Sequence, residues 1–145
     1  MAHILFISKS LHAPSTRYRV TQYLPLIQAS GWTAEHHVWQ GGAVRRLSIL
    51  SSARRADVVV VCRRLFAWPM LPLLRQVARR LVFDFDDAVF HGDTDEGSSS
   101  RARRFARIVR VSDGVWAGND YLADHARHFN ERVTVVPNAE LDFRP

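Results

Sequence analysis

The sequence predicts an α/β domain with a Rossmann-like, doubly wound and mainly parallel sheet of about six strands. Short apolar runs alternate along the whole chain with longer amphipathic stretches, which is the pattern of repeated βα units. The chain has 145 residues, of which 47% are hydrophobic and 23% charged, a balance that fits one globular domain with a sizeable core. We find no internal repeat that would indicate another architecture.

In the first half of the chain, strand and helix signals alternate. The run that begins at Ile4 is apolar throughout, as expected of a central strand covered on both faces, and the run that ends at Cys62 is rich in valine. Between them, Ser15 can cap a helix that Gly31 would end. The predicted strands span residues 4–8, 32–39 and 57–62, and the predicted helices span residues 16–30 and 44–55.

The second half repeats the alternation. Pro69 suits the first turn of a helix, and Pro137 stops the last strand. Residues 91–100 are polar, acidic and rich in Gly and Ser, so we expect a mobile loop there. The predicted strands span residues 81–85, 114–117 and 133–136, and the predicted helices span residues 68–80, 101–111 and 121–129.

The charge and the single cysteine bear on partners and compartment. The net charge is +6, almost all of it from arginine, which favours phosphates, nucleic acid or anionic lipid as partners without choosing among them. Because the basic residues are spread over several elements, we do not expect a nucleic-acid partner. Cys62 lies inside a predicted strand, so no disulfide framework exists and a cytoplasmic location is expected. No run approaches the roughly 20 apolar residues of a membrane span, and no secretory leader is recognisable.

The first candidate site follows the first predicted strand. It lacks the glycines of a dinucleotide fingerprint. Free N–H groups and the positive end of the dipole favour an anion at the start of the next helix, where arginines alone would be unfavourable. We therefore expect substrate or phosphate binding here; two solvated arginines beside an ordinary cap are the alternative. The residues concerned are Ser15, Thr16, Arg17, Tyr18 and Arg19.

A cluster of carboxylates at the end of a buried strand is the second candidate site. It consists of Asp84, Asp86 and Asp87. Strand alternation points Asp84 and Asp86 to the same side of the sheet. Like charges this close suit a general base or an anchor for sugar hydroxyls, so we assign these residues a catalytic role. The alternative is that they pair with arginines or cap the next turn.

Two helices provide weaker signals. Asn119 precedes a predicted helix, where it either contacts a ligand or caps the helix. The helix over residues 101–111 has a basic face, which usually faces solvent but also allows peripheral contact with the inner face of the cell membrane. His125 and His128 lie one helical turn apart without a third ligand, so we expect no metal site.

Taken in order, these segments resemble the N-terminal domain of bacterial group 1 (family 4) glycosyltransferases of the GT-B type. The resemblance rests on the first strand and on residues 15–19, 83–87, 116–123 and 133–138, and it spans essentially the whole chain. It implies the acceptor-side half of a retaining, metal-independent enzyme that moves a sugar from a nucleotide-sugar to a glycan, lipid or small-molecule acceptor. It also implies that residues 15–19 lie near the donor phosphates and that Asn138 joins the substrate-binding residues.

The same resemblance implies a domain organisation. Residues 1–136 would form the acceptor-side domain and residues 137–145 the start of an interdomain linker, with the donor-binding domain absent. The nucleotide-sugar would be a co-substrate, and no other cofactor is expected. We expect the chain alone to be inactive, and a face left bare to favour self-association or a separate partner chain.

Two alternatives stay open at this stage. Residues 82–90 also resemble the first motif of haloacid-dehalogenase-type phosphatases, in which Asp84 would be the nucleophile and Asp86 the acid/base, with magnesium as cofactor. The other alternative is a non-catalytic binding or regulatory module.

Overall fold

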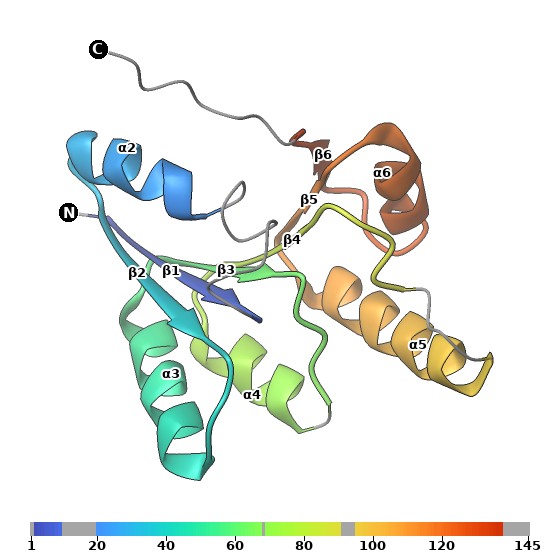
Figure 1. Ribbon diagram of the computed structural model, residues 1–145, viewed down its shortest axis with the longest axis horizontal. Helices are drawn as coiled ribbons and strands as arrows, with labels where there is room; N and C mark the ends of the chain where they lie inside the picture. The colour runs from blue at the N-terminus through green and yellow to red at the C-terminus, as the bar shows by residue number, and fades with distance from the viewer. Residues whose placement is uncertain (1, 10–19, 68, 91–94, 138–145) are drawn as a thin grey trace.

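The computed structural model describes residues 2–9, 20–67, 69–90 and 95–137. Its centre is a single open sheet of six strands in the order β2-β1-β3-β4-β5-β6, and every neighbouring pair is parallel (Figure 1). The Rossmann-like α/β class predicted from the sequence is therefore confirmed. The strands are β1 (His3–Ser8), β2 (Thr33–Val38), β3 (Val58–Cys62), β4 (Leu81–Phe85), β5 (Gly114–Ala117) and β6 (Val133–Val135).

Helices connect successive strands among the described residues. A short 3-10 turn, η1 (Thr21–Tyr23), leads into the first of them. They are α2 (Leu24–Ala29), α3 (Ala43–Arg55), α4 (Met70–Val77), α5 (Asp95–Val111) and α6 (Asp120–Arg127). The lengths and positions follow the alternation of apolar and amphipathic segments, because each helix must lay an apolar stripe on the sheet.

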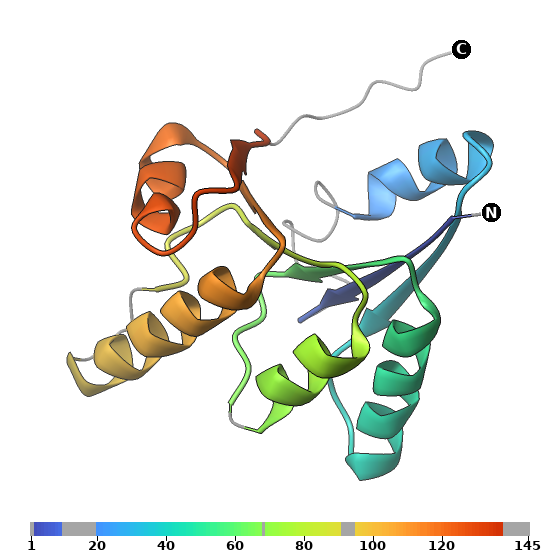
Figure 2. The same ribbon diagram turned by 180° about the vertical axis from the view of Figure 1, so that it is seen from behind.

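One face of the sheet carries four helices, α3, α4, α5 and α6, and we call it the covered face (Figures 1 and 2). Most strand side chains that point to it are buried and apolar. Half-buried side chains lie at its edges, namely Glu35 and His37 of β2 and Val133 and Val135 of β6. Phe105 of α5 is the centre of an aromatic group there, with ring centroids 5.9 Å from Phe83, 5.1 Å from Phe85 and 5.0 Å from Phe90. This face holds the main hydrophobic core of the domain.

The opposite face, which we call the α2 face, carries only α2 among the described helices (Figure 1). Val58, Val60 and Cys62 of β3 point to it, while Val59 and Val61 point to the covered face. Half-buried side chains such as Ile4 and Trp116 border its small core. Strand β3 is thus apolar on both sides although helices pack closely against only one of them.

Two predicted element boundaries are corrected. Within the predicted helix over residues 16–30, the described part is η1 followed by the short helix α2; Gly31, at φ 94°, ends α2 as expected. The expected mobile loop over 91–100 is wrong for residues 95–100, which form the first turns of α5. Gly and Ser are weak helix formers, but each residue added to an existing helix gains a backbone hydrogen bond.

Within the described part of the chain, no helix is long and apolar enough to cross a membrane. Cys62 is buried, as its position in a strand predicted.

Candidate functional site

The order in which strands are added to the sheet reverses between β1 and β3. From β1 the chain crosses to β2 on one side, then returns past β1 to β3 and continues outward to β6. In open parallel sheets, ligands bind outside the carboxyl ends of the strands at this reversal. Ser8 and Cys62 are register partners at that end of β1 and β3, and Lys9 and Arg63 follow them directly.

A small basic cavity, which we call the basic pocket, lies at this reversal. Its volume is about 140 Å³. Its cations come from three separate elements: the residue after β1, the two residues after β3, and two residues one turn apart on α5. It is lined by Lys9, Arg63, Arg64, Leu65, Val89, Arg101 and Arg104.

Arg63 turns the chain at the end of β3 and neutralises part of the aspartate cluster. It has φ 56°, a left-handed conformation that is unusual for a residue other than glycine. Its backbone N–H donates to the carbonyl of Asp84 at 2.8 Å. Its guanidinium lies 3.8 Å from Asp86 Oδ1 and 2.5 Å from Asp87 Oδ2. The arrangement matches the alternative in which the aspartates pair with arginine.

Arg64 points into the basic pocket with part of its guanidinium buried. Its Nε is inaccessible to solvent and has no hydrogen-bond acceptor among the described residues. Burial lowers the pKa of Arg64, and the nearby charges of Arg46 and Arg104 lower it further. A buried donor without an acceptor is costly, and native structures usually satisfy such a group with protein, water or an ion. Arg64 thus leaves one buried donor beside the basic pocket without an acceptor among the described residues.

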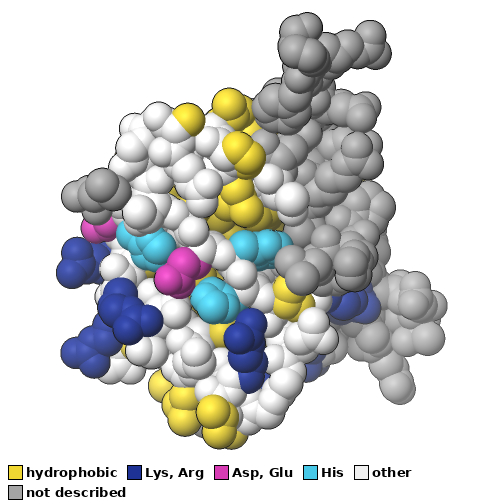
Figure 3. All heavy atoms as spheres, turned by 60° about the vertical axis from the view of Figure 1, so that its left-hand side comes forward, with side chains coloured by type: hydrophobic (Ala, Val, Ile, Leu, Met, Phe, Trp, Pro, Cys, Tyr) yellow, Lys and Arg dark blue, Asp and Glu magenta, His cyan; other side chains and the backbone are white. Residues whose placement is uncertain are grey.

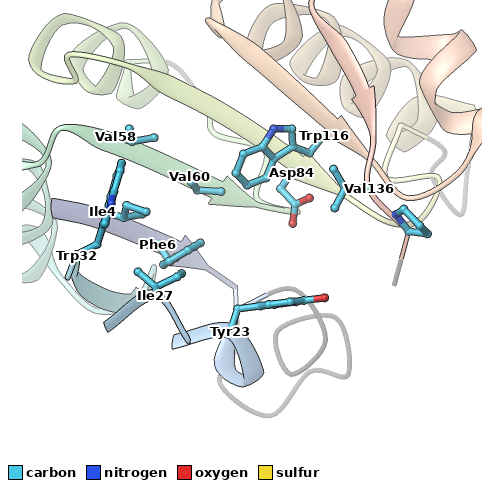
Figure 4. Close-up of a pocket in the computed structure, with 11 residues that line it drawn as sticks. Ile4, Phe6, Tyr23, Ile27, Trp32, Val58, Val60, Asp84, Trp116 and Val136 are labelled. Atoms are coloured by element: carbon cyan, nitrogen blue, oxygen red, sulfur yellow. The ribbon is translucent and has the colours of Figure 1, made fainter. Parts of the chain in front are cut away.

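The three predicted catalytic aspartates lie on different sides of the strand end. Asp84 is buried, and its carboxylate lies on the α2 face beside Trp116 and Val136 (Figure 4). Asp86 is half-buried and Asp87 is exposed, and both lie against Arg63. Two of the three carboxylates are thus held by an arginine, and the third faces an apolar surface; their catalytic role stays a prediction.

An apolar groove runs across the α2 face beside α2. Its volume is about 460 Å³, and Figure 4 shows side chains from β1, β3, α2 and β5 pointing into it. Asp84 is the one charged residue among its lining residues. The groove lies on the opposite side of the sheet from α5, the helix that supplies part of the basic pocket.

The turn between β5 and α6 presses against the end of β4. A Cβ on Gly118 would lie 2.9 Å from the Cα of Asp86, so only glycine allows this approach. Asn119 Oδ1 accepts a hydrogen bond from the backbone N–H of Leu122 at 2.9 Å. Asn119 therefore caps α6, the alternative to its predicted ligand contact.

Several predicted residues lie outside the described part of the chain. They are Ser15, Thr16, Arg17, Tyr18, Arg19 and Asn138. Their predicted binding of substrate or phosphate stays a prediction.

At the outer edge of the sheet, histidines gather around an acidic side chain (Figure 3). Glu35 lies 3.7 Å from His3 and 3.3 Å from His37. In the described ranges, no three His, Cys, Asp or Glu side chains are placed to hold a metal ion. The described residues therefore give no support to the alternative of a magnesium-dependent phosphatase.

Sequence reasoning missed Lys9, Arg63 and Arg64 as site residues. A signal was present, because two consecutive arginines directly follow the clearest buried strand. The predicted basic face of residues 101–111 is split in the structure: Arg101 and Arg104 line the basic pocket, whereas the other arginines of that helix lie along a separate shallow hollow.

No family model matches this chain, and no curated protein matches it. Among solved structures, it is similar to a chain of the crystal structure of the P1 domain of CheA3 in complex with CheY6 from R. sphaeroides. The TM-score is 0.49 and the sequence identity 16%, covering 88% of this chain and 95% of that chain. That crystal structure holds two partner proteins.

These results correct the identification made from the sequence. The solved structure reported above holds the P1 domain of CheA3 and CheY6 and not a glycosyltransferase, and no family model matches this chain. The prediction that the chain is half of a GT-B glycosyltransferase, and an enzyme of that class, is therefore wrong. The short motifs that supported it are common to parallel α/β sheets, because strand ends and helix caps impose similar residues on unrelated chains.

Proposed function

We propose that this chain is a non-catalytic binding module whose basic pocket binds the anionic group of a small ligand. The position of the pocket supports the proposal, since it lies at the carboxyl edge of the sheet where the strand order reverses. The observation that carries the proposal is that cations from three separate elements line one small cavity, among them Arg64, whose buried Nε has no acceptor among the described residues.

The balance of charge in the pocket favours an anion. Arg63 is engaged by Asp86 and Asp87. The other four cations, Lys9, Arg64, Arg101 and Arg104, have no carboxylate partner within the described ranges. Guanidinium groups present planar sets of donors that match phosphate and carboxylate oxygens, and such charge-assisted bonds are about twice as strong as neutral ones.

The size of the pocket limits what it can hold. Sites that enclose a whole drug-sized ligand measure about 300–1,000 Å³. At about 140 Å³ the basic pocket accommodates a phosphate or carboxylate group and leaves the rest of the ligand outside. The pyrophosphate of a nucleotide-sugar, the co-substrate expected from the sequence, is compatible with this chemistry and belongs in a ligand panel.

Contacts with larger partners stay predictions. The apolar groove would suit the expected self-association or a partner chain, and the exposed arginines of α5 would suit peripheral membrane contact. No described residue indicates what covers the groove, so the proposal does not rest on it.

A pair of variants on α5 tests the proposal. Arg104 lines the basic pocket, whereas its neighbour Arg103 is exposed and lies along the other hollow. Arg104→Gln and Arg103→Gln each remove one positive charge from the same helix, so long-range electrostatics change equally. We expect Arg104→Gln to weaken pyrophosphate binding about tenfold, the loss of one hydrogen bond to a charged group, and Arg103→Gln to change it less than about twofold.

The measurement is a titration with sodium pyrophosphate at constant ionic strength, followed by the backbone and arginine Nε signals in ¹H–¹⁵N NMR spectra. Movement of the Arg64 Nε signal would place the anion in the pocket. Equal weakening by the two variants would mean that pyrophosphate is held by the general positive field of the protein, and the proposal would fail.

A further inference from the structure

The residues of the basic pocket also indicate the charge of the ligand that it would bind. This inference rests on the proposed function and concerns the same site. The relevant observations are the number of cations without a described carboxylate partner, the lowered pKa of one of them, and the small volume of the cavity.

Among the described residues, the positive charge in the pocket exceeds what a single negative charge on a ligand would balance. Four cations line the pocket without a described carboxylate partner, and two of them, Arg101 and Arg104, lie on successive turns of one helix. Like charges at this spacing destabilise the helix that carries them. The pKa of Arg64 is lowered by burial and by the charges of Arg46 and Arg104, so these cations repel one another.

The shape of the pocket favours a ligand that presents a terminal group. The apolar side chains of Leu65 and Val89 form part of its wall, and its volume of about 140 Å³ leaves room for one tetrahedral anion. A phosphate diester carries a substituent on each side and one negative charge. A phosphate monoester carries one substituent, three free oxygens and a charge of about −1.5 to −2 at pH 7.

We propose that the basic pocket selects a terminal phosphate monoester in its dianionic form over phosphate diesters and carboxylates. Three arginines and one lysine would share the free oxygens, and the ester substituent would leave through the open side of the pocket. The ligand class is therefore a small molecule that carries a terminal phosphate monoester.

Methyl phosphate, dimethyl phosphate and acetate are matched probes for this proposal. At pH 7.5 and constant ionic strength, we expect methyl phosphate to bind the full chain at least about tenfold more tightly than the other two, since it adds a second charge and a third free oxygen. The second pKa of a phosphate monoester is about 6. Lowering the pH from 7.5 to 5.5 should therefore reduce its affinity about fourfold, toward that of dimethyl phosphate.

The diester serves as the control for titration of the protein itself. The charged residues that line the pocket are Lys9 after β1, Arg63 and Arg64 after β3, and Arg101 and Arg104 of α5. Asp86 and Asp87 lie against Arg63, and the charge of Arg46 acts on Arg64. No histidine is among the residues that line it. The affinity for dimethyl phosphate should accordingly stay constant over the same pH range.

The outcomes separate the two proposals. If neither pyrophosphate nor methyl phosphate binds in a manner that depends on Arg104, the proposed function fails. If both bind but dimethyl phosphate binds equally well, or the affinity for methyl phosphate does not change with pH, the anion site stands and the selection of a dianion is refuted. Arg64→Lys keeps the charge but loses the fork of donors, and it should reduce the preference for the monoester while methyl phosphate still binds.

Discussion

The two faces of the sheet differ in how fully helices cover them. On the covered face, the core between the sheet and helices α3 to α6 buries Phe83, Phe85 and Phe105 completely. On the α2 face, a single described helix packs against the sheet, and Asp84 and His36 lie among half-buried apolar side chains. The sequence of a strand therefore indicates which of its two sides are apolar, but it does not indicate how tightly helices pack against each side.

Stability and ligand binding are expected to depend on different parts of the molecule. The covered face supplies the packed core on which folding depends. The basic pocket lies at the carboxyl edge, where α5 of that face meets the ends of β1 and β3. Substitutions in the core should therefore change the free energy of unfolding, whereas those in the pocket should change affinity with little change in stability.

The largest expected effect comes from removing the aromatic centre of the covered face. Phe105→Ala should lower the free energy of unfolding by about 3–5 kcal/mol, because a fully buried ring and its packing are lost. Trp116→Ala on the α2 face removes a larger side chain that is only half-buried, and we expect a loss of about 1–2 kcal/mol. Urea denaturation of both variants makes the comparison. Equal losses would show that the α2 face is packed as tightly as the covered face.

A smaller effect is expected from two neighbouring valines in one strand. Val59→Ala empties a fully buried position on the covered face and should cost about 2 kcal/mol. Val58→Ala makes the same chemical change on the α2 face, where the side chain is half-buried, and should cost less than about 1 kcal/mol. The two variants share strand, residue type and β propensity. The predicted contrast would be lost if Val58→Ala proved the more damaging of the two in the same denaturation experiment.

The smallest effect concerns pH and belongs to the α2 face. His36 on β2 lies 2.6 Å from the hydroxyl of Ser8. Burial lowers the pKa of His36 from 6.5, and the nearby His37 lowers it further. The unfolded chain then binds a proton more readily than the folded chain, so stability is complete above pH 6.5 and falls as the pH drops below it.

His36→Gln should therefore flatten the dependence of Tm on pH between 7.5 and 5.5. His128→Gln, at an exposed position on α6, is the matched control and should leave the dependence unchanged. A His36→Gln variant that loses as much stability at pH 5.5 as the original chain would assign the dependence to another group.

Features of the fold that depend on residues close together in the sequence were predicted better than features that depend on contacts between distant residues. The six strands were placed within a few residues because each carries its own apolar run, and Gly31 was placed because the end of a helix requires a left-handed residue. The start of α5 was missed because weak local propensities were overruled by extension of a helix already formed. Asn119 illustrates a local signal with two meanings, and the hydrogen bond to Leu122 shows that it is a cap.

The site was harder to predict than the fold. Asp84, Asp86 and Asp87 look like one cluster in the sequence, yet the strand end separates them: Asp84 lies in the apolar groove and the other two lie against Arg63. The family assigned from short motifs was wrong for a related reason, because each motif reports a strand end or a cap and not the ligand beside it.

The sequence by itself determined the α/β class, the positions of the strands and the positive charge, since these follow from local periodicity and composition. Only the tertiary structure decided the strand order, and with it which strand ends are neighbours. Lys9 and Arg64 meet because β3 pairs with β1 and not with β2, and Arg101 and Arg104 join them because α5 packs on the covered face. Contacts between segments so distant in the chain are selected by the packing of the whole core, which no local pattern records.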